Sequence, residues 1–191
     1  MRGWIFVAAF LCAEALTFAV VCWKNPDLVR RRLQKIRPSQ PFDQLFVSLF
    51  GLMALAFLIV AGLDAARYSW WPLGREWIKI GLILYGFGAA VAGWAAVANS
   101  NLTCAVETEG RAVATGGPYR IVRHPMYVGR IISFLAWPLV LGSAWSYLPA
   151  CAIVVLFIFR TVHEDKFLQA QLAGYADYSR RTQYRLLPGV W

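Results

Sequence analysis

The chain has 191 residues, of which 59% are hydrophobic and only 15% are charged, so its composition excludes an ordinary soluble domain. Its length leaves room for one domain, and we expect residues 1–191 to form a single membrane-embedded unit. The formal net charge of +9 lies in short segments beside apolar runs, without an RNA- or DNA-binding motif, so membrane topology explains it better than a nucleic-acid partner does.

The first apolar run, residues 3–23, has about the length that a membrane-spanning helix requires. A cleaved signal peptide is the alternative, but only Arg2 precedes the run, and a strongly basic segment follows it at once. Glu14 lies in the middle of the run, where a carboxylate is costly to bury. We expect this carboxyl group to be protonated or bonded within the helix bundle, and its function stays open.

A basic loop follows at residues 24–44, and its six cations predict a cytosolic segment that could also contact anionic lipid headgroups. Two further spans are predicted at residues 45–63 and 77–98. The loop between them, residues 64–76, mixes arginines with tyrosine and tryptophan, as is typical of a bilayer interface. We expect that loop to be external.

Residues 115–129 form a polar, turn-rich island between long apolar runs. Two glycines and a proline interrupt any regular element there, so a ligand could meet bare backbone. Arg123 and His124 then supply charge and a titratable ring, and Pro125 can serve as the first residue of a new helix. On chemistry alone, a cytosolic loop with orienting arginines remains an alternative to a binding site.

Two apolar stretches follow at residues 126–141 and 147–162, and each is short for a full span, which favours a tight helical hairpin. After Arg160 the chain becomes polar. Apolar residues then recur at helical spacing and predict a C-terminal amphipathic helix, which Gly174 would end or kink: Phe167, Leu168, Leu172 and Tyr175. The predicted fold is therefore all-α, an integral membrane protein with about five transmembrane helices.

The distribution of cations predicts the orientation of these spans. Fifteen of the nineteen lysines and arginines fall in the segments that we place inside, and the others are Arg2, Arg67, Arg75 and Lys79. By the positive-inside rule, the N-terminus is external, while the C-terminus and the polar island are cytosolic.

Metal and nucleotide sites have little support in the sequence. The four cysteines are Cys12, Cys22, Cys104 and Cys151, without CxxC spacing, and the two histidines are too few for an obvious zinc or haem centre. Motifs typical of phosphate binding or of a serine nucleophile are also missing. We therefore predict no metal.

Three ordered segments together resemble the isoprenylcysteine carboxyl methyltransferase family, in its bacterial type. They are Gly-Pro-Tyr-Arg-x-x-Arg-His-Pro-Met-Tyr-x-Gly at residues 117–129, Arg160-x-x-x-Glu164 after the hairpin, and Gly-Tyr-x-x-Tyr with Leu-Leu-Pro-Gly in the tail. The resemblance covers roughly residues 80–191, and the related phospholipid N-methyltransferases share much of it. Sterol reductases, which bind NADPH, show a similar Arg-His-Pro-x-Tyr-x-Gly stretch and keep a redox alternative open.

The resemblance implies an S-adenosylmethionine site in a catalytic core at residues 76–191, with residues 1–75 supplying the first spans and the basic loop. The positions that match the family's cofactor contacts are Cys104, Arg111, Ala112, Val113, Ala114, Tyr119, His124, Pro125, Met126, Tyr127 and Glu164. Cys104 departs from the pattern, because the family places a glutamine there. Backbone groups, an aromatic face, a basic group and a carboxylate suit the adenosine and methionine portions of that cofactor.

The same resemblance places Arg160 on the substrate side, where its guanidinium could bind an acceptor carboxylate through two hydrogen bonds. The implied activity is carboxyl methylation of an isoprenylcysteine-like, lipophilic substrate at the cytosolic boundary of the lipid bilayer. Phospholipid N-methylation and NADPH-dependent reduction are the alternatives. Arg160 and Glu164 could also be a purely structural i, i+4 ion pair.

Overall fold

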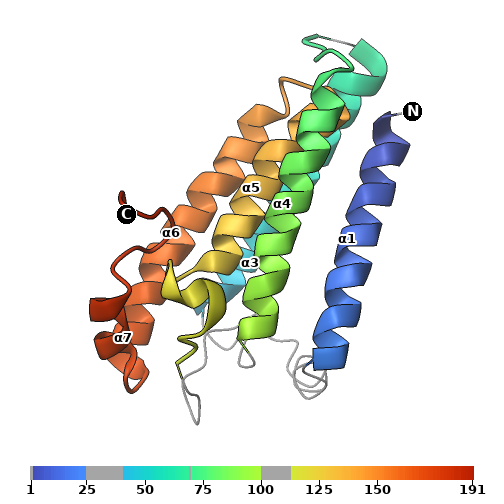
Figure 1. Cartoon of the computed structure of the whole chain (residues 1–191). Helices are drawn as coiled ribbons and strands as arrows, with labels where there is room; N and C mark the ends of the chain where they lie inside the picture. Colours follow the sequence, from blue (N-terminus) through green and yellow to red (C-terminus); the bar gives the residue numbers. More distant parts are fainter. Residues whose placement is uncertain (1, 25–40, 69, 100–112) are drawn as a thin grey trace.

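The computed structural model describes residues 2–24, 41–68, 70–99 and 113–191. The long helices run lengthwise beside one another (Figure 1). In chain order the helices are α1 (Arg2–Lys24), α3 (Pro41–Gly62), the π-helical η1 (Leu63–Tyr68), α4 (Trp77–Ala98), the 3₁₀ helix η2 (Gly117–Arg120), α5 (Pro125–Leu141), α6 (Tyr147–Gln171) and α7 (Tyr175–Arg181). The described residues contain no named strand, which confirms the predicted all-α class.

Three of the described helices are long and apolar enough to cross a membrane: Pro41–Ala65, Trp77–Ala98 and Tyr147–Gln171. Helix α5 is apolar but has only 17 residues, and α1 has 23 residues. The membrane character of the fold is therefore confirmed, while the number of five spans stays a prediction.

Helix α6 differs from the predicted second arm of the hairpin, because it continues past residue 162 to Gln171. The polar residues that suggested an end at Arg160 face the protein interior, where Arg160 and Asp165 are 3% and 0% exposed. The predicted amphipathic segment is consequently divided. Leu168 belongs to α6, which ends at Gln171. Gly174 adopts φ = 80° and directly precedes the separate helix α7, which has only seven residues.

The contact between α4 and α5 depends on small residues. A Cβ atom added at Gly88 would lie 2.6 Å from Ser133 Oγ and 2.7 Å from the Gly129 carbonyl oxygen, and one added at Gly129 would lie 2.6 Å from the Ala92 amide nitrogen. Larger side chains at these glycines would force the helices apart. Close helix packing thus explains why Gly88 and Ala92, four residues apart on α4, are small.

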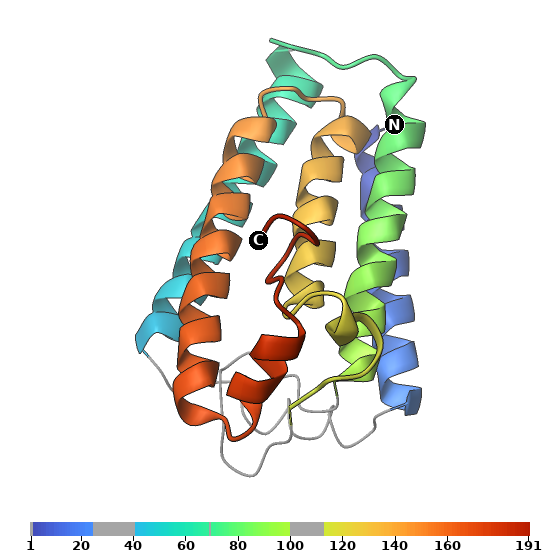
Figure 2. The same ribbon diagram turned by 60° about the vertical axis from the view of Figure 1, so that its left-hand side comes forward.

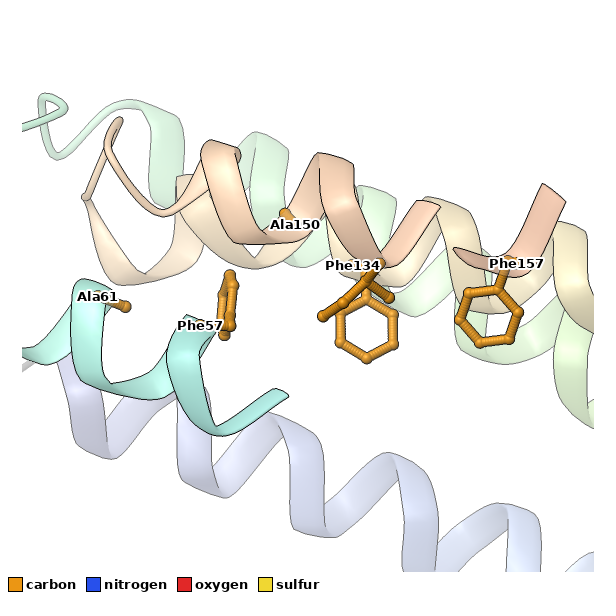
Figure 3. Packing of buried hydrophobic residues seen from close by; sticks show 6 residues of the cluster. Phe57, Ala61, Phe134, Ala150 and Phe157 are labelled. Carbon is orange, nitrogen blue, oxygen red and sulfur yellow. The ribbon is translucent and has the colours of Figure 1, made fainter. Parts of the chain in front are cut away.

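An aromatic core joins α3, α5 and α6. Its buried members, drawn in Figure 3, include Phe57 from α3, Phe134 from α5 and Phe157 from α6. The Phe134 and Phe157 ring centroids are 6.2 Å apart, and the Phe134 and Trp137 centroids are 4.4 Å apart. This core holds α6 against α5, and therefore fixes the position of the polar residues on the last turns of α6.

The end of the bundle that carries the α5–α6 connection is closed by polar contacts. Buried Asp64 accepts hydrogen bonds from the Ser143 hydroxyl at 2.6 Å and from the Trp71 amide at 3.0 Å. The Ala144 amide donates to the Trp71 carbonyl at 3.1 Å. Trp70 and Trp71 remain exposed there, as expected for aromatic residues at a bilayer interface.

Candidate active site at the polar end of the bundle

The polar island folds as a short turn followed by a helix start. Gly117 adopts φ = 58°, a conformation that favours glycine, and an added Cβ would lie 3.1 Å from the Trp94 indole nitrogen. Pro118 and Tyr119 are buried in η2. Pro125 is the first residue of α5, as the sequence predicts. The His124 carbonyl accepts a hydrogen bond from the Tyr127 amide at 3.1 Å.

The C-terminal segment holds the island from the other side. The Arg123 amide donates to the Tyr184 carbonyl at 2.9 Å, and the His124 amide donates to the Arg185 carbonyl at 3.0 Å. The Tyr178 hydroxyl donates to the Tyr119 carbonyl at 2.8 Å. In Figure 2 this segment turns back from α7 and runs back along α6. The island is therefore bracketed between α4 and the tail.

Asp165 on α6 is the centre of a buried hydrogen-bond network. Its carboxylate accepts two hydrogen bonds from Arg123 Nη1, each at 2.8 Å, and one from Arg185 Nε at 3.0 Å. His124 Nε2 lies 3.4 Å from the same carboxylate, and the Tyr175 hydroxyl donates to it at 2.9 Å. One buried side chain thus joins α6, the island, α7 and the tail.

The neighbouring residue on α6, Glu164, belongs to a second cluster. The Tyr127 hydroxyl donates to the Glu164 carboxylate. Arg160 Nε lies 3.3 Å from Glu164 Oε2 and also 3.3 Å from the Tyr127 hydroxyl oxygen. Arg160 Nη1 donates in addition to Asp43, which is 2% exposed in the first turn of α3.

Aromatic rings surround this second cluster. The Arg160 guanidinium lies 5.0 Å from the Phe46 ring centroid and 5.5 Å from that of Phe42. The Tyr127 ring is stacked parallel to His124, at 5.7 Å between centroids. His124 therefore contacts both clusters, since its ring nitrogen also faces Asp165.

Two tyrosines outside the apolar spans keep their protons near neutral pH. Burial raises the pKa of Tyr119 to about 12, and the negative charge of Glu164 adds to this, against a lowering hydrogen bond from Asn99. Burial and the Asp165 carboxylate raise the pKa of Tyr175. Tyr175 is thus a stable hydrogen-bond donor within the network.

The structure brings most of the sequence-predicted site residues together. Val113, Ala114 and Met126 pack against a cluster that contains Tyr119. Buried Pro125 and His124 connect this cluster to the polar group formed by Tyr127, Arg160 and Glu164. Cys104, Arg111 and Ala112 lie outside the described residues, as does most of the basic loop at 24–44.

Several central residues were missed by the sequence reasoning. Asp43 was not singled out, and Arg123 was identified only as a charge of the polar island, without its buried partner, although Arg123 is 8% exposed. Asp165 follows Glu164 directly, and the sequence offers no period or motif that separates their roles. Arg123 and Asp165 are 42 residues apart in the chain, and Asp43 and its partner Arg160 are 117 residues apart, so no local pattern reveals either pair.

One buried hydrogen-bond donor of the island can bind a further acceptor. Arg123 Nε is buried and has no hydrogen-bond partner among the described residues. Buried donors of this kind are rare in folded proteins and call for an explanation, for which a ligand carboxylate is one candidate. Glu164, with 19% of its side chain exposed, supplies an acceptor on the facing helix. The residues present thus fit a ligand that carries both a carboxylate and hydrogen-bond donors.

Comparisons with known proteins identify one family model and two partial relatives. The family model described as phospholipid methyltransferase matches residues 77–173, from the start of α4 to just beyond α6. A cobalt-zinc-cadmium resistance protein, CzcN, from Cupriavidus metallidurans is 34% identical over 91 residues, which are 42% of this chain and 39% of that protein. A mouse delta(14)-sterol reductase, TM7SF2, is 34% identical over 87 residues, 43% of this chain and 20% of that protein. The matches span well under two thirds of either relative.

Proposed function

The chain belongs to the phospholipid methyltransferase family, and we propose that it transfers a methyl group from S-adenosylmethionine to a lipophilic acceptor at the cytosolic boundary of the membrane. The observation that carries this proposal is the convergence of the island and α6. Tyr127, Arg160 and Glu164 form one bonded group, and His124 links that group to the buried Asp165 network. A structural ion pair alone does not account for so many buried polar groups near one end of the bundle.

In this proposal, the cofactor when bound supplies an electrophilic methyl group on a sulfonium. Val113, Ala114 and Met126 would line its apolar side, together with Tyr119. Arg123 Nε would donate to its carboxylate, and Glu164 would accept hydrogen bonds from its ammonium or ribose hydroxyls. The contacts expected at Cys104, Arg111 and Ala112 belong to the same proposal.

For the acceptor, our first candidate is the carboxylate of an isoprenylcysteine-like substrate. Arg160 would bind it, and Phe42 and Phe46 beside the guanidinium would contact its apolar portion. A carboxylate is ionised at neutral pH and needs no general base, so the chain's residues would act by aligning it and excluding water. Because Asp43 already bonds to Arg160, the acceptor carboxylate would have to replace Asp43.

That Asp43 contact favours a second candidate, the amine of a phospholipid. This cluster contains two carboxyl groups, from Asp43 and Glu164, but only one guanidinium, from Arg160. A surplus of negative charge suits a cationic headgroup, and an ammonium must lose its proton before its nitrogen attacks. Either carboxylate could take that proton.

Single-turnover transfer from labelled S-adenosylmethionine distinguishes the two candidates. Wild type, Arg160→Lys and Asp43→Asn would each receive a prenylated cysteine analogue or phosphatidylethanolamine. For a carboxylate acceptor, Arg160→Lys slows methyl transfer at least tenfold, because the planar guanidinium that makes two hydrogen bonds is lost. Asp43→Asn keeps that guanidinium and retains methyl transfer. For an amine acceptor, Asp43→Asn slows transfer and Arg160→Lys is tolerated. Transfer to neither substrate, with S-adenosylmethionine bound, would reject both acceptors.

A further inference from the structure

Residues 187–190 form a tight turn in the tail, and the exposed side chains of this tail turn are apolar. Leu187 is 56% exposed and Val190 is 77% exposed. Between them lie Pro188, which has no amide hydrogen, and Gly189, which adopts φ = 80°. Surface turns usually carry polar residues that contact water, so a turn with this composition calls for another explanation.

Several backbone amides of the tail turn and its base have partners within the same segment. The amides of Arg185, Leu186 and Leu187 all donate to the Trp191 carbonyl, at 2.9, 3.0 and 3.1 Å. The amides of Val190 and Trp191 donate to the Leu187 carbonyl, at 3.2 and 3.1 Å. These five donors do not depend on water, so moving the turn toward lipid costs them no hydrogen bond.

The tail turn reaches the height at which the outer surface of α6 changes from polar to apolar. That surface carries Lys166, which is exposed, and nearer the middle of the helix Phe159 and Val155, which are 66% and 49% exposed. The tail runs back along α6 from α7, and Arg185 Nε holds it there by donating to Asp165 at 3.0 Å. In Figures 1 and 2 the C-terminal end lies level with the middle of α6, whereas α7 lies at its lower end.

The residues at the base of the tail turn suit the boundary between lipid headgroups and acyl chains. The Arg185 guanidinium lies 5.2 Å from the Trp191 ring centroid and keeps 28% of its side chain exposed. Residues 186–191 contain no charged side chain. Tryptophan and arginine beside an apolar segment are typical of a membrane interface, where the ring and the guanidinium lie among headgroups while apolar side chains contact acyl chains.

We propose that the tail turn is a membrane-interface anchor, in which Leu187 and Val190 insert among the acyl chains of the lipid leaflet on the α7 side of the bundle. Because the Arg185 carbonyl accepts the His124 amide at 3.0 Å, the anchor connects the polar island directly to that leaflet. The partner is the lipid leaflet itself, not a methyl acceptor. The anchor therefore requires no part of the methyl transfer proposed above.

Spin labelling of the full chain in vesicles of phosphatidylcholine and phosphatidylglycerol tests this anchor. The four native cysteines are replaced by alanine, and a nitroxide is attached at Val190→Cys or, in a second variant, at Leu187→Cys. Oxygen concentrates in hydrocarbon and a neutral nickel complex stays in water, so power saturation of the EPR signal measures which medium each nitroxide contacts. The reference sites are Val155→Cys, on the exposed apolar surface of α6, and Ala176→Cys, which is exposed on α7.

We expect both tail nitroxides to lose collisions with the nickel complex relative to Ala176→Cys, and their oxygen-to-nickel ratio to approach that of Val155→Cys. Thermal unfolding of each variant, followed by circular dichroism, will show that the labelled proteins fold. A ratio at Val190→Cys equal to that at Ala176→Cys would place the turn in water and overturn the proposal. Shielding from both reagents would also overturn it, because a protein surface would then cover the turn. These readouts involve neither cofactor nor acceptor, so they stand apart from a failure of the proposed methyl transfer.

Discussion

Replacing Asp165 by asparagine should destabilise the protein strongly, because one carboxylate holds four separate segments. The substitution keeps the size of the side chain but removes its charge. Arg123, whose side chain is 7% exposed, would then be a buried cation without its bidentate partner. Removing one partner of a buried ion pair costs about 3–5 kcal/mol. The Arg185 contact adds less, because that side chain is 28% exposed.

A loss of this size corresponds to a fall of roughly 10 °C in Tm for a chain of this length. Thermal unfolding in detergent, followed by circular dichroism, measures it. Asp177→Asn is the matched control, since Asp177 pairs with Arg180 on the surface, with exposed fractions of 66% and 77%, and its loss should change Tm little. An Asp165→Asn variant that unfolds within 2 °C of wild type would refute the central role of this carboxylate.

Three further predictions concern packing, orientation and the cofactor. Gly88→Ala should lower the free energy of unfolding by about 1–3 kcal/mol, because the new methyl carbon would lie 2.6 Å from a serine oxygen. Gly86→Ala, with no atom within 4 Å, should leave stability unchanged or raise it. Equal stability of the two variants would contradict the α4–α5 packing. Reporter fusions at the C-terminus and within residues 24–44 should both be cytosolic, and an external C-terminus would reverse the predicted topology. His124→Ala and Glu164→Ala should each weaken S-adenosylmethionine binding at least fivefold in calorimetry while the protein stays folded, and unchanged affinity would remove that residue from the proposed site.

Local sequence patterns predict the helix boundaries that local chemistry controls. The span predicted at residues 77–98 coincides with α4. Pro125 begins α5, because a missing amide is harmless at a helix start, and Gly174 ends the turn after α6 through its positive φ. These features depend on one or two neighbouring residues, so a single sequence is sufficient to find them.

The end of α6 and the polar networks could not be predicted in the same way. Charged residues after position 159 suggested that the chain leaves the apolar core, yet Arg160 and Asp165 are buried by partners that are distant in sequence. Glu14 likewise needed Arg130, 116 residues away, to explain its position. Whether a charge is solvated or buried depends on such tertiary partners, which neither composition nor periodicity reveals.

Isothermal calorimetry of the detergent-purified chain with S-adenosylmethionine and, separately, with NADPH tests the proposed methyl transfer most directly. The proposal predicts saturable, one-site binding of S-adenosylmethionine that Glu164→Ala weakens, and no comparable binding of NADPH. Saturable binding of NADPH without binding of S-adenosylmethionine would contradict it and favour the reductase alternative.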